Sequence, residues 1–146
     1  MPRDPSTESE KELPTLSLRG RSDLSDLRFL AKLPQLLMLD LSHCTQVSDL
    51  RPLSRLAQLT TLILDSCYHV NDLSPLAKLS QLTTLDLDSC YQVNDLRPLA
   101  GLTRLTALSL KYCSSVSDLR PLAGLARLTI LNLQRCQMSD LRPLLD

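Results

Sequence analysis

The chain has 146 residues, of which 43% are hydrophobic and only 3% aromatic, and its formal net charge is zero. This length predicts a single domain, and the balanced charge removes the simplest electrostatic argument for a nucleic-acid or membrane partner. With no Trp and one Phe, the core must be built from aliphatic side chains.

The first twelve residues, MPRDPSTESEKE, are polar, carry mixed charge and contain no apolar run. They match neither a signal peptide nor a membrane span. We therefore expect a flexible polar tail over residues 1–12, followed by a repeat domain over residues 13–146.

From there, a unit of twenty-three residues recurs along the chain. Each unit begins LxxLxLxxCxxV and continues [SN]-D-L-x-P-L-x-x-L, with changes at a few places. The copies, which we call coils 1 to 6, begin at Leu13, Leu36, Leu59, Leu82, Leu105 and Leu128. Repetition at this period is typical of solenoids, so it decides the fold before any other pattern.

The first half of each unit has the period of a strand. In coil 4, leucines and aspartates alternate, which predicts that Leu85 and Leu87 point inward and that Asp86 and Asp88 point outward. Such a strand is short and has one buried face.

The second half of each unit spaces its leucines by three, which predicts a 3₁₀ or short helical return. In coil 4, Asp95 is placed to accept the N–H groups that open this turn, and Pro98 sits early in it, where a missing N–H costs little. One unit cannot bury its own leucines, so neighbouring coils must stack and pair their strands. The expected fold is an α/β solenoid of about six coils, with a parallel sheet on the concave face and 3₁₀ or short helical returns on the convex face.

All the cysteines share one position of the repeat: Cys44, Cys67, Cys90, Cys113 and Cys136. We expect a column of small buried thiols. Adjacent coils lie about 4.8 Å apart, so distance alone does not exclude a disulfide. Parallel side chains point the same way, however, and no CxxC pair suggests zinc. Free thiols indicate a reducing compartment, so we expect a cytoplasmic protein.

The two end coils depart from the pattern. Coil 1 has Arg21 in place of the cysteine and Phe29 in place of the proline, as in a cap. Coil 6 is shortened, because Met138 follows Cys136 by two residues rather than three. Without a recognisable cap it should expose part of its leucine ladder, and so pack on another copy, on a missing domain or on a continuation of a longer protein.

The motif LxxLxLxx followed by [SN]DLxPLxxL resembles the short leucine-rich repeats of bacterial internalins and of the regulatory subunit of protein phosphatase 1. The CxxV variant is similar to the cysteine-bearing repeats of some bacterial and trypanosomatid proteins and to the F-box-associated class. The first two families usually have Asn at the cysteine column and one residue fewer before the Val. The resemblance implies a leucine-rich repeat horseshoe or arc that presents a concave sheet to another protein. The specific roles of these relatives do not carry over, since no motif outside the framework accompanies them.

The variable strand positions carry the information about a partner. Four carboxylates should converge on the middle of the concave face: Asp40, Asp65, Asp86 and Asp88. Like charges this close repel one another unless they are screened or positive groups neutralise them, which favours a partner with a basic or amphipathic segment. Lys111 follows Asp88 in the same column, one coil further on.

On the loops that leave the strands, Tyr68 and Tyr91 occupy the same position of successive coils, and Tyr112 lies two positions earlier in coil 5. These tyrosines could form one cluster, with His43 and His69 on the same rim, and tyrosine is a frequent interface anchor. The alternative is a surface stack that only covers the turn.

Basic residues occupy the convex half of the coils: Arg51, Arg55, Lys78, Arg97, Arg104, Arg120, Arg127 and Arg142. They predict an acidic inner and a basic outer face. We expect these side chains to pack their aliphatic stems on the surface and keep their charges in water, and nucleic-acid binding by the basic face is the less favoured alternative. Carboxylates on an open sheet do not predict an enzyme, because no pocket excludes water. The sequence therefore predicts a non-catalytic protein-interaction module without a cofactor or metal, with assembly through the C-terminal coil as the alternative.

Overall fold

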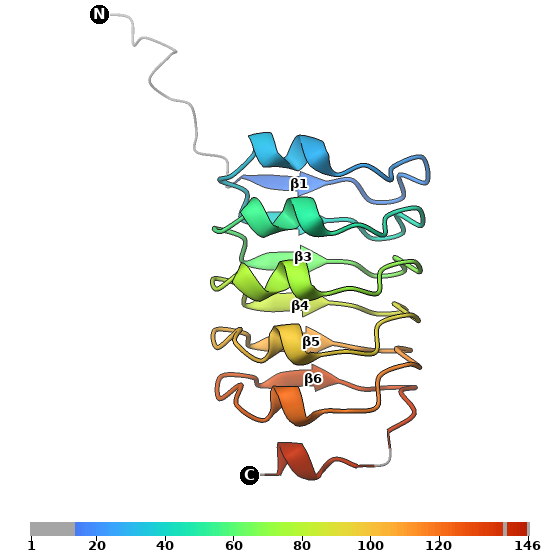
Figure 1. The fold of residues 1–146 in the computed structure, drawn as a ribbon, viewed down its shortest axis with the longest axis vertical. Coiled ribbons are helices and arrows are strands. Elements are labelled where there is room, and N and C mark those ends of the chain that lie inside the picture. The colour runs from blue at the N-terminus through green and yellow to red at the C-terminus, as the bar shows by residue number, and fades with distance from the viewer. Residues whose placement is uncertain (1–13, 139, 146) are drawn as a thin grey trace, which may run out of the picture.

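The computed structural model describes residues 14–138 and 140–145. The expected N-terminal tail, residues 1–12, lies outside the described residues. Within them, each coil contributes one three-residue strand and one short 3₁₀ turn (Figure 1). The strands are β1 Thr15–Ser17, β2 Met38–Asp40, β3 Thr61–Ile63, β4 Thr84–Asp86, β5 Ala107–Ser109 and β6 Ile130–Asn132. The 3₁₀ turns are η1 Arg28–Lys32, η2 Arg51–Arg55, η3 Ser74–Lys78, η4 Arg97–Leu99, η5 Arg120–Leu122 and η6 Arg142–Leu144.

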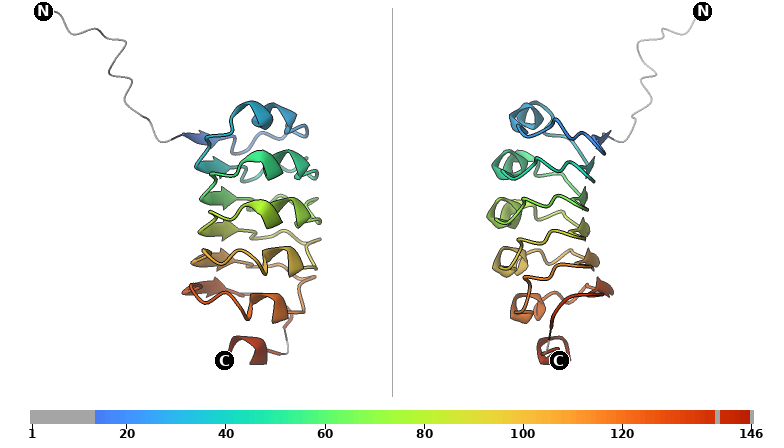
Figure 2. Two further views of the ribbon diagram at one scale, coloured as in Figure 1. Left: turned by 60° about the vertical axis from the view of Figure 1, so that its left-hand side comes forward. Right: turned by 90° about the vertical axis from the view of Figure 1, so that its right-hand side faces the viewer.

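The six strands form one parallel sheet in chain order, and the register advances by one repeat from strand to strand. In the centre of the sheet, Leu62 pairs with Leu85, and Leu85 pairs with Leu108. The sheet forms one face of the solenoid and the 3₁₀ turns form the opposite face (Figure 2). The exposed side of the sheet is the concave face of the sequence prediction. The helical part of the described fold is 3₁₀ throughout, so the predicted short returns are confirmed in their tighter form.

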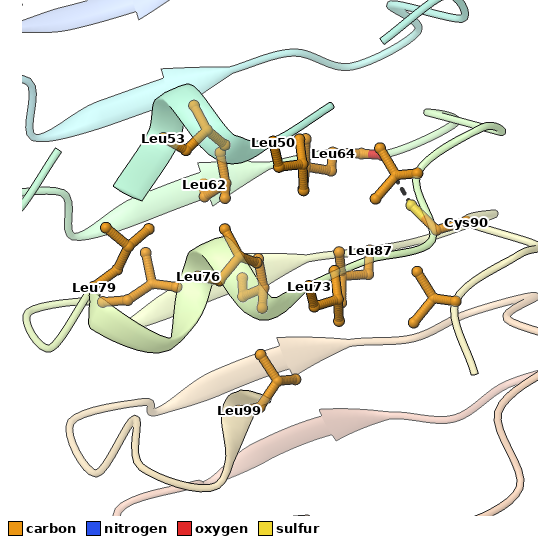
Figure 3. Packing of buried hydrophobic residues seen from close by; sticks show 14 of the residues in the cluster. Leu50, Leu53, Leu62, Leu64, Leu73, Leu76, Leu79, Leu87, Cys90 and Leu99 are labelled. Atoms are coloured by element: carbon orange, nitrogen blue, oxygen red, sulfur yellow. Dashed lines mark hydrogen bonds between the residues drawn. The ribbon is translucent and has the colours of Figure 1, made fainter. Parts of the chain in front are cut away.

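The core is a single stack of leucines with the cysteine and valine columns beside it (Figure 3). Leu85 and Leu87 are buried as the alternation predicted, and Asp86 and Asp88 between and beyond them stay partly exposed. The core thins at both ends of the stack. In coil 6, the ladder residues Leu128, Leu131 and Leu133 are only partly buried and Leu145 is 76% exposed, as expected for the last coil.

Each 3₁₀ turn begins as predicted, with one refinement. Asp95 Oδ1 accepts the backbone N–H of Arg97 at 2.9 Å, and Pro98 follows early in η4. The residue at the N-cap position itself is Leu96, so the carboxylate that caps the turn comes from one residue earlier. The aspartate of this motif thus holds the chain as it passes from the buried valine to the turn.

The buried thiols bond between coils. The Cys90 thiol donates to the carbonyl oxygen of Leu64 in the preceding coil at 3.3 Å, the contact drawn as a dashed line in Figure 3. All five cysteines are free, and each makes the equivalent contact. Burial raises the pKa of the Cys67 thiol to about 12, so these thiols stay protonated donors. The thiol is a second donor to this carbonyl, because the Leu64 oxygen also accepts the N–H of Cys67 at 3.0 Å.

A further column has left-handed backbone. Directly before each cysteine lie His43, Ser66, Ser89, Tyr112 and Arg135, with φ between 57° and 63°, and coil 1 has Gly20 there with φ 75°. Non-glycine residues seldom adopt this conformation, which costs roughly 1 kcal/mol. It turns the chain sharply so that in coils 1 to 5 the N–H group of this residue reaches the next coil, as Ser66 does to the Asp88 carbonyl at 2.8 Å.

The thiol contact can be tested at Cys90. Replacing it by Ala leaves the buried Leu64 carbonyl without this donor, whereas Ser keeps a donor of similar size. We expect Cys90→Ala to lower the free energy of unfolding by about 1–3 kcal/mol and Cys90→Ser to be the more stable of the two. Urea denaturation measures both. Equal stabilities for the two variants would show that the bond contributes nothing.

Candidate functional site

The candidate site lies on the concave face over strands β2 to β5. Asp40 and Asp86 are the last residues of β2 and β4, and Ile63, the last residue of β3, pairs with both in register. Strands in a sheet lie about 4.8 Å apart, so the two carboxylates are about 10 Å apart with an aliphatic side chain between them. The sequence predicted the acidic cluster but did not separate these two aspartates from the others.

The local backbone fixes both carboxylates. Asp40 Oδ1 accepts the N–H of Ser42 at 2.9 Å and also its hydroxyl, and Asp86 Oδ1 accepts the N–H of Asp88 at 2.9 Å. Among the described residues, Oδ2 of each carboxylate has no hydrogen-bond donor. Each side chain is therefore oriented in advance and presents one free oxygen along the concave face.

The other two carboxylates have partners of their own. His43 Nε2 lies 3.7 Å from Asp65 Oδ2, and Ser66 donates to Asp65 at 2.9 Å. Asp88 accepts the Ser109 hydroxyl and, at 2.9 Å, the N–H of Lys111. The structure thus brings all four predicted aspartates onto one face. Of the four, Asp65 has a histidine beside it, whereas Asp88, like Asp40, is bound only through Oδ1 by a hydroxyl and a backbone N–H.

The electrostatics of the face single out Asp86. The pKa of Asp86 is raised, first because burial disfavours its charged form and then because Asp88, Asp65 and Asp40 repel it. The N–H of Asp88 acts in the opposite direction, since it stabilises the ionised carboxylate. A positively charged group beside Asp86 would offset much of this unfavourable electrostatic energy.

The predicted tyrosine cluster is only partly present. The rings of Tyr68 and Tyr91 stack with their centroids 5.4 Å apart and their planes 9° from parallel, and both are substantially exposed. Tyr112 belongs to the left-handed column, and its ring lies 5.2 Å from the Lys111 ammonium rather than in the stack. The stack therefore contains two of the three predicted rings, and Tyr112 contacts Lys111 instead.

The two histidines also have different neighbours. His43 faces Asp65 on the concave side. His69 lines a hollow with Asn71 and Asp72 on the flank of the coils, where the chain runs toward the 3₁₀ turns. Their placement on a shared rim is not supported, since the loop turns between these two columns of the repeat.

The predicted basic outer face is partly neutralised by aspartates on the same flank. Arg51, Arg97, Arg120 and Arg142 each bind the aspartate two residues earlier at 2.8 Å. The side chains of these arginines point away from the core but their charges are matched on the same rim. Sequence reasoning missed these pairs, although the repeated DLR triplet was their signal.

Residues 14–138 and 140–145 contain no group of three or more His, Cys, Asp or Glu side chains arranged to hold a metal ion. No helix within these ranges is long and apolar enough to cross a membrane. The carboxylates lie on an open sheet, which suits recognition of another molecule better than exclusion of water.

Stacked short coils, a parallel sheet and ladders of leucine and cysteine define a leucine-rich repeat solenoid. The family model described as Zer-1-like leucine-rich repeats matches residues 27–96. A comparison with curated proteins gave no significant match. The chain is therefore a member of the leucine-rich repeat superfamily.

Solved structures agree with this assignment. Internalin InlF from Listeria monocytogenes is 32% identical with a TM-score of 0.78, over 82% of this chain and 34% of that one. Internalin C2 from the same organism is 31% identical with a TM-score of 0.56, over 82% of this chain and 61% of that one. The functional domain of InlJ, which includes a cysteine ladder, has a TM-score of 0.63 over 77% of this chain and 23% of that one. At 23% identity, InlJ supports the fold alone. The chain spans less than two thirds of each of these proteins.

The raised pKa of Asp86 predicts a stability that depends on pH. A carboxyl whose folded pKa lies above its unfolded value favours the folded state at low pH, and this contribution is lost as pH rises through the folded pKa. We therefore expect Asp86→Asn, which keeps the acceptor for Asp88, to raise Tm at pH 7 by a few degrees. The gain should vanish below about pH 3.8, where the wild-type carboxyl is also neutral. Calorimetry across this range measures it.

Asp95→Asn is the control of opposite sign. The Arg97 guanidinium and N–H lower the pKa of Asp95, so its contribution is present above the unfolded pKa and is lost as pH falls through the folded one. This variant should melt below wild type at pH 7 and approach it in acid. A pH-independent effect at both positions would contradict the assigned charges.

Proposed function

We propose that this protein is a non-catalytic interaction module that binds a basic or amphipathic segment of a partner protein on its concave face. The observation that carries this proposal is the row Asp40, Ile63, Asp86, in which two fixed carboxylates with free oxygens flank an aliphatic side chain. Leucine-rich repeat relatives support the general role of protein binding. The row supplies the specific chemistry.

The spacing of this row favours a helical segment. Asp40 and Asp86 lie two strands apart, about 10 Å. A helix rises 1.5 Å per residue, so two turns span about 10.5 Å and place residues i and i+7 opposite the two carboxylates. Residue i+3 or i+4 then lies over Ile63. The proposed partner segment is a helix with basic residues at i and i+7 and an apolar residue between them.

The setting that we propose is a reducing, cytoplasmic one. Five free thiols, three of them deeply buried with strongly raised pKa values, suit a compartment in which cysteines are not oxidised. Their donor role also requires the reduced form, because a disulfide has no S–H to offer. The proposed function needs neither a metal nor a cofactor.

A designed peptide tests the concave face. The probe is a helical peptide with lysines at i and i+7 and leucine at i+4, and its control is a scrambled peptide of the same composition. We expect Asp86→Asn to weaken binding several-fold and Asp86→Lys at least tenfold, measured by fluorescence anisotropy. Asp23→Lys makes the same charge change on an exposed loop of coil 1 and should leave affinity nearly unchanged. Equal losses at both sites, or equal binding of the scrambled peptide, would refute the proposal.

Assembly through coil 6 is the second candidate, and two observations favour it. Ile130, Leu141 and Leu145 are exposed there, beside a hollow of about 290 Å³ lined by leucines. Among the described residues, the N–H groups of Leu133 and Arg135 have no acceptor, although their equivalents in other coils bond to the next coil. The edge of the sheet at β6 is thus open in its backbone as well as apolar.

The opposite edge of the sheet, at β1, lacks one backbone donor. In coils 2 to 6 the second residue donates its N–H to the preceding coil, as Thr60 does to Leu37 at 2.8 Å. Coil 1 has Pro14 at this place, which has no N–H to donate. Head-to-tail stacking of copies would therefore lack one backbone hydrogen bond, which favours self-association through two β6 edges.

Light scattering across a concentration series tests this second candidate. We expect the mass of the wild type to rise toward that of a dimer, and Leu141→Lys with Leu145→Lys to return it to that of a monomer. A matched charge addition at the other end, Ser22→Lys with Ser25→Lys, should have no effect. A wild type that stays monomeric at all concentrations excludes assembly through coil 6.

A further inference from the structure

One ion pair recurs along the flank of the solenoid. In five coils the carboxylate that caps the 3₁₀ turn also binds the arginine two residues later: Asp26–Arg28, Asp49–Arg51, Asp95–Arg97, Asp118–Arg120 and Asp140–Arg142. In coil 4, Arg97 Nε donates to Asp95 Oδ1 at 2.9 Å and Nη2 donates to Oδ2 at 2.8 Å. This is the two-point contact that guanidinium groups make with carboxylates. The position is therefore one that accepts an arginine side chain.

Coil 3 breaks the series. Ser74 stands where the other coils have arginine, and its N–H still donates to Asp72 Oδ1 at 2.9 Å. Among the described residues, Asp72 has no cationic partner. The Ser74 side chain and then its N–H lower the pKa of Asp72, whereas desolvation and like-charge repulsion from Asp95 and Asp49 on the neighbouring coils act in the opposite direction. Asp72 is thus an exposed carboxylate, held by the same backbone contact as its equivalents but without their counter-charge.

The flank is hollowed between neighbouring coils. Two hollows of about 320 and 390 Å³ adjoin Asp72, and Asn71 and Asp72 line both, while a similar hollow of about 350 Å³ lies beside the paired Asp26 and Arg28. Asn71 and Asn94 occupy a column in which coils 1, 2 and 5 have Ser25, Ser48 and Ser117. The stacked Tyr68 and Tyr91 stand three residues before these asparagines on the same loops. We call this set of residues, Tyr68, Asn71, Asp72, Tyr91 and Asn94, the coil 3–4 flank.

We propose that the coil 3–4 flank binds an arginine side chain of a partner polypeptide, with its guanidinium on Asp72 as the protein's own arginines lie on the equivalent carboxylates. Arginine fits better than lysine because its planar fork reaches both oxygens of a carboxylate. The side-chain amides of Asn71 and Asn94 can donate to and accept from the extended backbone beside that arginine. An isolated surface ion pair contributes little, so the hollows and amides are needed for affinity. This surface is separate from the concave face and uses a different carboxylate.

Two short peptides serve as probes, acetyl-Gly-Arg-Gly-amide and its lysine counterpart, titrated into the full chain and followed by NMR. We expect the arginine peptide to shift the Asp72 carboxyl carbon and the side-chain amides of Asn71 and Asn94. The lysine peptide should bind at least threefold more weakly. Ser74→Arg supplies the internal partner seen in five other coils and should weaken binding of the arginine peptide at least tenfold. Ser80→Arg adds the same charge elsewhere in coil 3 and should leave binding nearly unchanged.

A second variant relocates the site. Arg97→Ser removes the internal partner of Asp95, so the double variant Ser74→Arg/Arg97→Ser should move the carboxyl response from Asp72 to Asp95. An Asp72 response that survives Ser74→Arg overturns the proposal, as does a response confined to Asp40 and Asp86. The concave face is judged separately, because Asp86→Lys should weaken binding of the helical peptide at least tenfold and leave the Asp72 response intact.

Discussion

The whole structure depends on packing and hydrogen bonding between neighbouring coils. No coil encloses its own leucines, and the strands have only three residues each, so both the core and the backbone pairing exist only between coils. The thiol of each coil donates to a carbonyl of the coil before it. Thr60, Thr83, Thr106 and Thr129 do the same with their hydroxyls. A coil is therefore the repeating unit of the sequence, but a single coil would not be stable on its own.

This constraint explains which features of the fold were readable from sequence. Leu85 and Leu87 repeat in every coil because each must cover the next, and a pattern repeated six times leaves no doubt about which face is buried. Asp95 was assigned to its turn for the same reason, since a chain that turns once per coil must satisfy the turn each time. The stacking order and register of the sheet follow directly from the period.

The features that sequence reasoning missed depend on side-chain directions within the loops. Gly20 shares a column with Ser66 and Ser89, which hinted at left-handed backbone, but the other members of the column hid the signal. That column decides where Tyr112 points, and so why it does not join Tyr68 and Tyr91. The partners of Asp65 and Asp88 were also unreadable, because they depend on contacts between a carboxylate and the side chain or backbone of an adjacent coil.

The distinctive residues gather in the middle of the stack, and there is a physical reason for this. In a solenoid the end coils have a neighbour on one side only, and here they are the ones whose leucines are partly exposed. A recognition surface there would be ordered only by binding, at a cost in affinity. In the central coils, Asp86 and Asp72 are held by backbone on cores that are buried from both sides. The repeated framework thus lets the central coils carry uncompensated charge on two separate surfaces without loss of order.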